Sequence, residues 1–502
     1  MKPIFIDGEN LTLEDVEEVA LRGAQVRISP SAKAKIAKCR KYVDKILESG
    51  QRVYGINTGF GKLCQMMIDK DDIGKLQENL IRSHAVGFGP VFSENEVRAI
   101  MLLRANVLAK GYSGARLELV QRLVDMLNKR VHPVVPEKGS VGSSGDLAPL
   151  SFIALVLMGE GWAFYKNRVM DGSLALKKAG IKPIRPSAKE GLALVNGTQV
   201  MTAVAILNLL KAERLASLAD VSGAMSLDGI LGSPVPFDPD LQRTRKHRGQ
   251  MEVAVHLSKL MKNSQIREFH RACPKIQDPY SFRCMPQVHG AVRDTLRYVR
   301  QVLEVEANSA TDNPIIFADK NKVVSGGNFH GEPVAFAMDF TSIAMSELGS
   351  ISERRMAAII DPSTSGLPSF LSKKPGLNSG FMTAQTAAAA LVSENKTLAF
   401  PASVDSIPTS INQEDHVSMG TISARKAREI INNVEDILST EFLIASQALD
   451  FRKPLKTSPI LQRVHDVIRK SVSQLEDDRI LMPDLVKVKE LMRMNFGADR
   501  SW

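Results

Sequence analysis

The stretch FMTAQTAAAALVSENKTLAF, residues 381–400, is the clearest indication of the fold. It combines strong helix formers with apolar side chains on more than one face, which is typical of a helix buried inside a bundle or at a subunit interface. Similar long helical patterns recur near residues 197–226, 287–309, 331–360 and 421–450. The sequence therefore predicts a mainly α protein with a core of long helices.

The first 90 residues have a different pattern. Short β-prone pieces at Pro3–Ile6, Val26–Ile28 and Val53–Tyr54 alternate with helical segments, and glycines punctuate YGINTGFG at residues 54–61. Ser93 in SENEV resembles a helix N-cap followed by acidic first-turn residues. We expect a smaller α+β domain over residues 1–110 and a long-helix domain over residues 111–502 that carries most of the candidate site.

The composition is that of an ordinary soluble protein. The 502 residues are 44% hydrophobic and 24% charged, with a mean hydropathy of −0.08. No apolar stretch reaches the ~20 residues that a membrane span needs. The start, MKPIFIDGEN, lacks the basic and then apolar order of a secretory signal. We therefore expect a cytoplasmic protein with no membrane partner.

Net charge, cysteine spacing and histidine spacing indicate whether nucleic acid or a metal is a partner. The net charge of +10 raises the possibility of nucleic-acid binding, but the best basic patch, RTRKHR at residues 243–248, contains no aromatic residue and indicates a solvated loop. Cys39, Cys64, Cys273 and Cys284 form no CxxC pair, which favours reduced thiols. The histidines show no zinc-ligand spacing, so neither a metal nor nucleic acid is expected.

The segment KGSVGSSGDLAPLS, residues 138–151, is chemically unusual. It matches neither the phosphate-binding GxxxxGK[ST] pattern nor the GxSxG nucleophile elbow. A tight Ser143-Ser144-Gly145 turn permits backbone cyclisation, in which the Gly145 nitrogen attacks the carbonyl carbon of Ser143 and Ser144 loses water. Glycine suits the attacking position because it has no side chain to hinder the approach. The alternative register, Gly142-Ser143-Ser144, would use a hindered serine amide.

This segment resembles the electrophile-forming Ala-Ser-Gly triplet of the aromatic amino acid ammonia-lyase family, with Ser143 in place of alanine. The resemblance covers roughly residues 53–458 and is closest to the histidine-specific branch. It rests on these blocks in order: VYGINTGFG 53–61, SHAVG 83–87, LALVNGTQ 192–199, QDPYSFRC 277–284, TDNP 311–314, SGGNFHGEP 325–333 and NQEDHVSM 412–419. It implies an ammonia-lyase/fumarase-like architecture, a homotetramer with shared active sites, and a 4-methylidene-imidazol-5-one ring formed autocatalytically from Ser143, Ser144 and Gly145, with no metal or nucleotide.

The resemblance also implies a role for individual residues. Tyr54 would remove the β-proton, which requires its phenol pKa to be lowered by cationic or dipolar groups. Arg283 would hold the substrate carboxylate with two hydrogen bonds. The remaining implied site residues are Asn196 and Gln277 as neutral hydrogen-bonding groups, Tyr280 beside the prosthetic ring, Phe329 as a wall of the site, and His84 and Glu414 as substrate-selecting groups.

His84 and Glu414 indicate the substrate. Imidazole carries an N–H donor and a basic nitrogen, so a histidine and a carboxylate can pair with it, whereas a carboxylate buried against a phenyl ring would lose several kcal/mol of solvation. The expected reaction is the elimination of ammonia from L-histidine to give trans-urocanate, the first step of histidine degradation. A tyrosine or phenylalanine lyase, an aminomutase and a lyase acting on an N-methylated histidine remain alternatives, and a non-enzymatic basic binding protein is a remote one.

Overall fold

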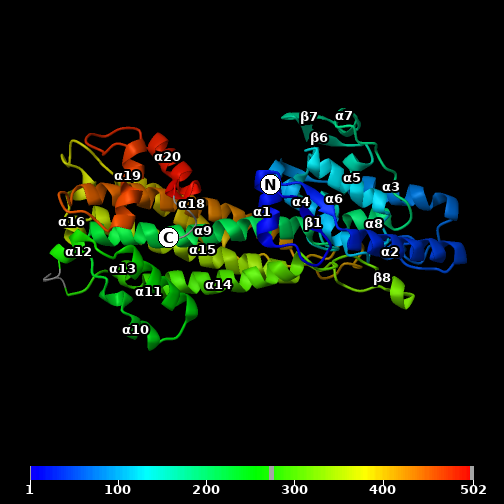
Figure 1. Cartoon of the computed structure of the whole chain (residues 1–502), viewed down its shortest axis with the longest axis horizontal. Coiled ribbons are helices and arrows are strands. Elements are labelled where there is room, and N and C mark those ends of the chain that lie inside the picture. Colours follow the sequence, from blue (N-terminus) through cyan, green and yellow to red (C-terminus); the bar gives the residue numbers. More distant parts are fainter. Residues whose placement is uncertain (1, 271–275, 498–502) are drawn as a thin grey trace. The chain divides into compact units, whose positions relative to one another are not determined.

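The computed structural model describes residues 2–270 and 276–497 (Figure 1). Cys273 lies outside these residues, whereas every candidate site residue lies within them. The chain is mainly helical, as the sequence predicted. The α-helices are α1 Leu13–Arg22, α2 Pro30–Ser49, α3 Ile73–His84, α4 Glu94–Ala109, α5 Leu117–Asn128, α6 Leu147–Leu157, α7 Gly172–Lys178, α8 Glu190–Val195, α9 Gln199–Gly229, α10 Pro239–Arg243, α11 Arg248–Leu260, α12 Gln265–Phe269, α13 Tyr280–Arg283, α14 Met285–Glu306, α15 Glu332–Ile360, α16 Pro362–Ser365, α17 Met382–Leu398, α18 Gly420–Asp450, α19 Pro459–Ser471 and α20 Met482–Arg493.

The strands are short and form small separate sheets. β1 Ile4–Ile6 pairs in parallel with β2 Val26–Ile28, with α1 as the connection. The antiparallel pairs are β3 Phe88–Val91 with β5 Pro136–Lys138, β4 His132–Pro133 with β6 Trp162–Tyr165, β6 with β7 Arg168–Asp171, and β8 Ile315–Phe317 with β9 Lys322–Val324. Short 3₁₀ segments lie at Gly61–Leu63, Lys70–Asp72, Val235–Phe237, Ala318–Lys320, Ser369–Leu371 and Asn495–Gly497. The expected strands near residues 3–6 and 26–28 are thus confirmed.

The expected strand at Val53–Tyr54 is wrong. The N–H of Val53 donates to the side-chain oxygen of Asn57 at 2.9 Å, and the carbonyl of Val53 accepts from the N–H groups of Ile56 and Asn57. These local bonds close the segment into a turn, so its backbone groups are satisfied without a neighbouring strand. Tyr54 therefore sits on a loop rather than in a sheet.

Helix α4 begins where the sequence predicted. The Ser93 hydroxyl accepts from the Glu96 N–H while the Glu96 carboxylate accepts from the Ser93 N–H, which forms a capping box. From Glu96 to Ala109 every residue of α4 is buried, because neighbouring helices cover all of its faces. Helix α4 is therefore an interior helix of the N-terminal part of the chain.

The chain divides into two compact units, neither of which is continuous in sequence. The first unit comprises residues 1–208, 300–339 and 401–425, and the second comprises residues 209–299, 340–400 and 426–502. The boundaries fall within the long helices α9, α14, α15 and α18 and just after α17. The division into domains 1–110 and 111–502 stays a prediction.

Buried charges join the long helices of the second unit. Glu441 on α18 accepts hydrogen bonds from Ser222 and Ser226 on α9 and from Ser352 and Arg355 on α15. The side chains of Glu441 and Arg355 are both fully buried. Oε1 of Glu441 accepts two of these hydrogen bonds and Oε2 accepts three, so the charge is compensated where water cannot reach it.

The same network extends to α14. Arg355 contacts a ring nitrogen of His289 at 3.2 Å, and the other ring nitrogen of His289 lies 2.6 Å from the Asp220 carboxylate on α9. Burial alone would raise the pKa of Asp220, but the hydrogen bonds from His256 and His289 and the charge of Arg293 lower it. Four helices are thus held together by ionic groups as well as by apolar packing (Figure 1).

Helix α17, which carries the alanine-rich stretch, is only partly covered within the chain. Of its residues, Ala384, Ala388 and Asn395 are buried, and most of the others are exposed or half-buried. Within a single chain, α17 is therefore not enclosed on all faces. The interpretation as a subunit interface stays open.

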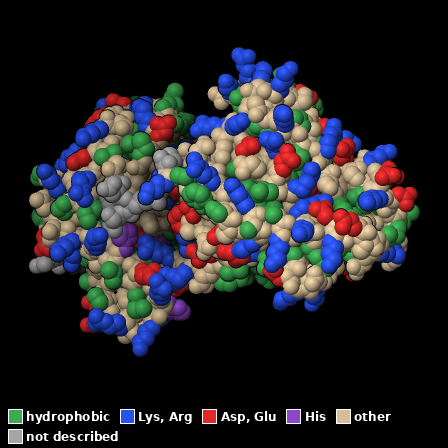
Figure 2. Space-filling view, turned by 45° about the vertical axis from the view of Figure 1, so that its right-hand side comes forward, with side chains coloured by type: hydrophobic (Ala, Val, Ile, Leu, Met, Phe, Trp, Pro, Cys, Tyr) green, Lys and Arg blue, Asp and Glu red, His purple; other side chains and the backbone are tan. Residues whose placement is uncertain are grey.

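The surface carries charged side chains of both signs. Figure 2 shows lysine and arginine side chains scattered among acidic and uncharged ones on the face in view. Within the described ranges, no helix has the length and apolar character needed to cross a membrane.

We expect the Glu441→Gln substitution to lower the free energy of unfolding by about 3–5 kcal/mol, because it leaves the Arg355 charge buried without its counter-ion. The matched control is Glu476→Gln, which removes the partner of Lys373 in an exposed pair and should cost less than about 1 kcal/mol. Chemical unfolding monitored by circular dichroism measures both. Equal effects of the two substitutions would contradict the structural role of Glu441.

Candidate active site

The Ser143-Ser144-Gly145 segment forms a tight loop immediately before α6. Residues 143 and 145 are paired by an isolated backbone bridge, and Gly145 has a φ of +72°. A Cβ at Gly145 would lie 2.2 Å from the carbonyl oxygen of Gly197, a contact that no side chain can make. The loop therefore requires glycine at the position that supplies the attacking nitrogen, and the closeness of residues 143 and 145 favours the Ser143-Ser144-Gly145 register. The chain thus fits the prosthetic ring.

Asp146, which directly follows this loop in sequence, fixes its position. Its fully buried carboxylate accepts from the N–H groups of Val200 and Met201, each at 2.9 Å, in the first turn of α9. It also accepts from the hydroxyl groups of Thr421, in the first turn of α18, and Ser140. The first turns of two helices thus bind one carboxylate, α9 through backbone N–H groups and α18 through the Thr421 hydroxyl, which fixes the loop relative to both helices within the first unit.

Asn196 lies on the other side of the loop. Its side-chain N–H donates to the carbonyl oxygen of Ser144 at 3.1 Å, and its own carbonyl accepts from Arg104 at 2.9 Å. The side-chain oxygen of Asn196 is buried and has no hydrogen-bond partner among the described residues. A buried acceptor without a donor costs free energy, so this oxygen is suited to receive an N–H from a ligand.

Glu414 is brought to the same loop from a distant part of the sequence. One of its carboxylate oxygens lies 3.4 Å from the Ser144 hydroxyl, which donates to it. The other accepts from the hydroxyls of Thr409 at 2.8 Å and Ser410 at 2.7 Å. The carboxylate is half-buried, and these hydroxyls orient it while leaving part of it open to solvent.

The charge of Glu414 also acts on the Tyr54 phenol. Its phenol oxygen accepts from the Gly61 N–H at 3.3 Å. Burial raises the pKa of the Tyr54 phenol, the bond from Gly61 opposes this, and the negative charges of Cys64 and Glu414 raise it further. The expectation of a lowered pKa is therefore not met within the chain, because burial raises the pKa of the phenol most and nearby negative charges add to this rise.

His84 and Phe329 also belong to the first unit. His84 is the last residue of α3, and its Nδ1 lies 2.8 Å from the carbonyl of Leu80, to which it donates. A carbonyl oxygen only accepts, so Nδ1 carries the proton of this bond, and Nε2 of an uncharged ring is then an acceptor. Phe329 is half-buried on the loop between β9 and α15.

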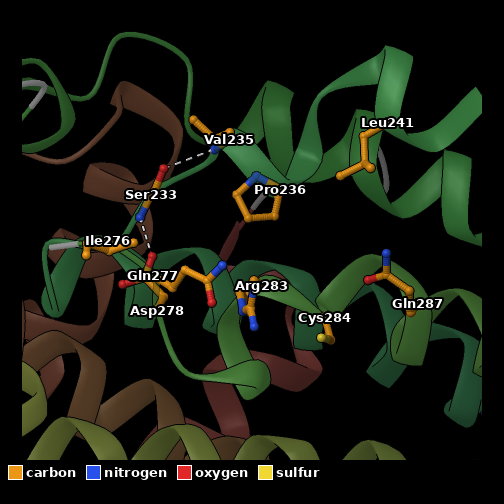
Figure 3. Close-up of a pocket in the computed structure, with 10 residues that line it drawn as sticks. All are labelled: Ser233, Val235, Pro236, Leu241, Ile276, Gln277, Asp278, Arg283, Cys284 and Gln287. Atoms are coloured by element: carbon orange, nitrogen blue, oxygen red, sulfur yellow. Dashed lines mark hydrogen bonds between the residues drawn. The ribbon is translucent and has the colours of Figure 1, made fainter.

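Gln277, Tyr280 and Arg283 belong to the second unit. Gln277 and Arg283 line a cavity of about 380 Å³, drawn in Figure 3 with Val235, Pro236 and Leu241 on its opposite side. Ser233, Ile276, Asp278, Cys284 and Gln287 complete its lining. The cavity presents a cation and an amide to a polar ligand.

Tyr280 and Arg283 interact directly. The guanidinium of Arg283 lies over the Tyr280 ring, 4.6 Å from its centroid, and Tyr280 is 72% exposed. The Nε of Arg283 is buried without a hydrogen-bond partner among the described residues. An arginine held by stacking, with a donor still unused, is suited to bind a carboxylate.

Sequence reasoning missed Asp146, Thr409 and Ser410. An acidic residue directly before an apolar helix, as Asp146 is, is a recognisable N-terminal signal that could have indicated it. Thr409 and Ser410 gave no signal, because their role depends on a loop that folds back on Glu414.

Comparisons with known proteins identify the family of the chain. The profile of the family described as aromatic amino acid lyase matches residues 11–470. The chain belongs to this family. Its membership confirms the class of enzyme expected from the sequence, a carbon–nitrogen lyase.

Relatives within the aromatic amino acid lyase family span nearly the whole chain. The chain is 52% identical to the histidine ammonia-lyase of Myxococcus xanthus (strain DK1622) over 489 residues, which are 97% of this chain and 96% of the relative. The crystal structure of histidine ammonia-lyase from Trypanosoma cruzi superposes with a TM-score of 0.92 at 43% identity, covering 99% of this chain and 94% of that one.

A tyrosine aminomutase from Streptomyces globisporus has a TM-score of 0.94 at 40% identity, covering 99% of this chain and 98% of that one. The expected ammonia-lyase architecture is thus confirmed, and the backbone alone does not separate a lyase from an aminomutase. The identity of substrate and reaction has to be argued from the side chains of the site.

We expect the stability of the wild type relative to Asp146→Asn to fall as the pH rises. Complete burial raises the pKa of Asp146 to about 6 from an ordinary 3.8, against the hydrogen bonds that lower it. The stabilisation is therefore present below pH ~4 and is lost as the pH rises through about 6, a change of about 3 kcal/mol. Chemical unfolding of both proteins between pH 4 and 8 measures it, and a constant difference would contradict it.

Proposed function

We propose that the chain is a histidine ammonia-lyase that eliminates ammonia from L-histidine to give trans-urocanate. The observation that carries this proposal is the Glu414 carboxylate, 3.4 Å from the Ser144 hydroxyl and oriented by Thr409 and Ser410. A carboxylate acceptor at the ring-forming serine suits an imidazole N–H. A phenyl ring would remove water from this carboxylate without offering it a hydrogen bond. The full-length identity to histidine ammonia-lyases supports the same substrate.

The reaction has to break a C–N bond and remove a weakly acidic β-proton. The 4-methylidene-imidazol-5-one ring that Ser143, Ser144 and Gly145 would form supplies an electrophile for the substrate amine. Asn196 would hold the carbonyl of residue 144 through its amide and accept an N–H of the substrate through its unused oxygen. Asp146 acts as a positioning residue, since it fixes the loop on two helix N-termini.

Tyr54 is the proposed base for the β-proton. Its electron pair would take the proton as the C–N bond breaks, the carbon–carbon double bond forms and ammonia leaves. Because burial raises the pKa of the Tyr54 phenol, ionisation requires positive charge brought by the substrate ammonium or by a neighbouring subunit. Water exclusion around the half-buried phenol then favours transfer of the proton over its loss to solvent.

His84 and Glu414 are the proposed substrate-selecting pair. The Nε2 acceptor of His84 can receive one imidazole N–H, and Glu414 can receive another N–H from the ring or the amine. Arg283 and Gln277 would bind the substrate carboxylate, with Tyr280 beside the prosthetic ring and Phe329 as a wall. Tyrosine remains the nearest competitor, because its hydroxyl can also pair with His84.

A homotetramer with active sites shared between subunits is part of the proposal. Residues from separate sequence blocks then need not be close within one chain. In the second unit, Tyr298, Phe340 and Ile343 are 44%, 42% and 51% exposed, and α17 presents further apolar side chains to solvent. Burial of such surface is the usual drive for obligate assembly.

The cytoplasm is the proposed location. Cys39, Cys64 and Cys284 are free thiols in the structure, which is typical of proteins in reducing compartments.

We expect the intact chain to show a mass lower by two waters, because ring closure and dehydration of Ser144 each release one. The Ser144→Ala variant should keep the full mass and lose activity. Mass spectrometry of the intact protein, with ammonia release measured on the same sample, tests this. An unmodified mass together with full activity would exclude the ring mechanism.

The Glu414→Gln substitution should lower histidine turnover by at least ~100-fold, the scale on which a group acting on the reacting atoms contributes. His84→Leu should reduce turnover of histidine more than that of phenylalanine, because the removed group pairs only with a polar ring. The measurement is ammonia release from histidine, tyrosine, phenylalanine and N-methylated histidines.

Asp415→Asn is the matched control, since Asp415 is an exposed carboxylate next to Glu414 in the sequence. It should leave turnover nearly unchanged. A wild type that prefers tyrosine, with both site substitutions leaving that preference unchanged, would contradict the histidine assignment. Absence of turnover with every amino acid of the panel would favour a binding protein instead.

A further inference from the structure

A cluster of potential metal ligands lies beside the site but takes no part in the proposed reaction. One ring nitrogen of His330, one of His416 and a carboxylate oxygen of Glu332 all lie within 4.8 Å of one another. The two imidazole rings are stacked, with centroids 5.8 Å apart and an angle of 15° between their planes. All three residues belong to the first unit, so a single compact body holds the cluster.

The polar atoms of this cluster are poorly satisfied. The Nε2 of His330 and the Oε2 of Glu332 are buried atoms with no hydrogen-bond partner among the described residues. The Nδ1 of His330 lies 3.9 Å from the Glu332 carboxylate, which is too far for a hydrogen bond. Buried polar atoms of this kind normally have a partner, so the cluster is arranged for a ligand that accepts electron pairs from all three side chains.

A divalent cation suits these three side chains, because it would compensate the Glu332 carboxylate and accept electron pairs from both imidazoles at short range. His416 is exposed and the other two side chains are half-buried, so an ion can enter from solvent.

We propose that His330, Glu332 and His416 bind a divalent transition-metal ion, with Zn²⁺ as the best match. Two imidazoles and one carboxylate form a ligand set that suits borderline ions and leaves a fourth position for water. The hard ions Mg²⁺ and Ca²⁺ prefer all-oxygen sites. Small rotations of the side chains would bring the three ligand atoms to the spacing that a tetrahedral ion requires.

The bound ion would connect two loops that carry proposed site residues. His416 follows Glu414 by two residues, and His330 directly follows Phe329. Glu332 is the first residue of α15, which anchors this connection to a long buried helix. The ion thereby acts as a positioning element for both loops and touches no reacting atom.

The test is calorimetric titration of Zn²⁺ into chelator-treated full-length protein, with the same titration of His330→Ala and His416→Ala. We expect about one Zn²⁺ per chain, and binding at least about tenfold weaker in each variant, because even residues that only support a metal ligand contribute that much. His247→Ala is the matched control, since His247 is an exposed histidine in the second unit. It should bind Zn²⁺ as the wild type does.

A second measurement keeps the proposal falsifiable if a variant folds poorly. Co²⁺ added to the wild type should give visible absorption bands of a low-coordinate nitrogen and oxygen site, and Zn²⁺ should abolish them. Absence of saturable Zn²⁺ binding by the wild type, or equal binding by the wild type and both histidine variants, would overturn the proposal.

The Ser144→Ala variant separates this inference from the proposed function. It cannot form the prosthetic ring, but it retains all three metal ligands, so it should bind Zn²⁺ with unchanged stoichiometry. Loss of Zn²⁺ binding in this variant would overturn the proposal of a metal site that is independent of the ring. Unchanged binding without turnover would support that proposal.

Discussion

The arrangement of the active site depends on one buried carboxylate. Asp146 follows the Ser143-Ser144-Gly145 loop directly and accepts hydrogen bonds from the first turns of α9 and α18. Because the group is fully buried, each missing hydrogen bond would cost the free energy of a desolvated polar group. The position of the loop is therefore tied to the two long helices, and a shift of either helix would displace Ser144 from Asn196 and Glu414.

The candidate site and the helix core around Glu441 differ in how far their polar groups are satisfied. In the first unit the polar groups converge on a loop and leave acceptors such as the Asn196 side-chain oxygen unused. In the second unit, Glu441 and Arg355 satisfy one another deep among the helices, with three serines completing the bonding. Incomplete satisfaction is the property expected of a binding site, whereas complete satisfaction is typical of a structural core.

The fold was largely predictable because it follows from local patterns. The α4 capping box at Ser93, the β1–β2 pieces and the long helical stretches each depend on residues that are near one another in sequence. One expectation failed: Val53–Tyr54 is β-prone, but the side chain of Asn57, which is close in sequence, closes it into a local turn. For the alanine-rich α17, only the tertiary structure shows that most of the helix is exposed or half-buried within one chain.

The sequence alone determined the helical fold class, the cyclising Ser-Ser-Gly segment and the family, since these depend on residue order and local backbone chemistry. Only the tertiary structure decided that Glu414 reaches Ser144, that burial and nearby negative charges raise the pKa of Tyr54, and that His330 approaches His416. These contacts join residues from distant parts of the chain. The geometry of these contacts arises only when the loops pack against the helices. The same packing removes water from the side chains and so sets their pKa values and their binding properties.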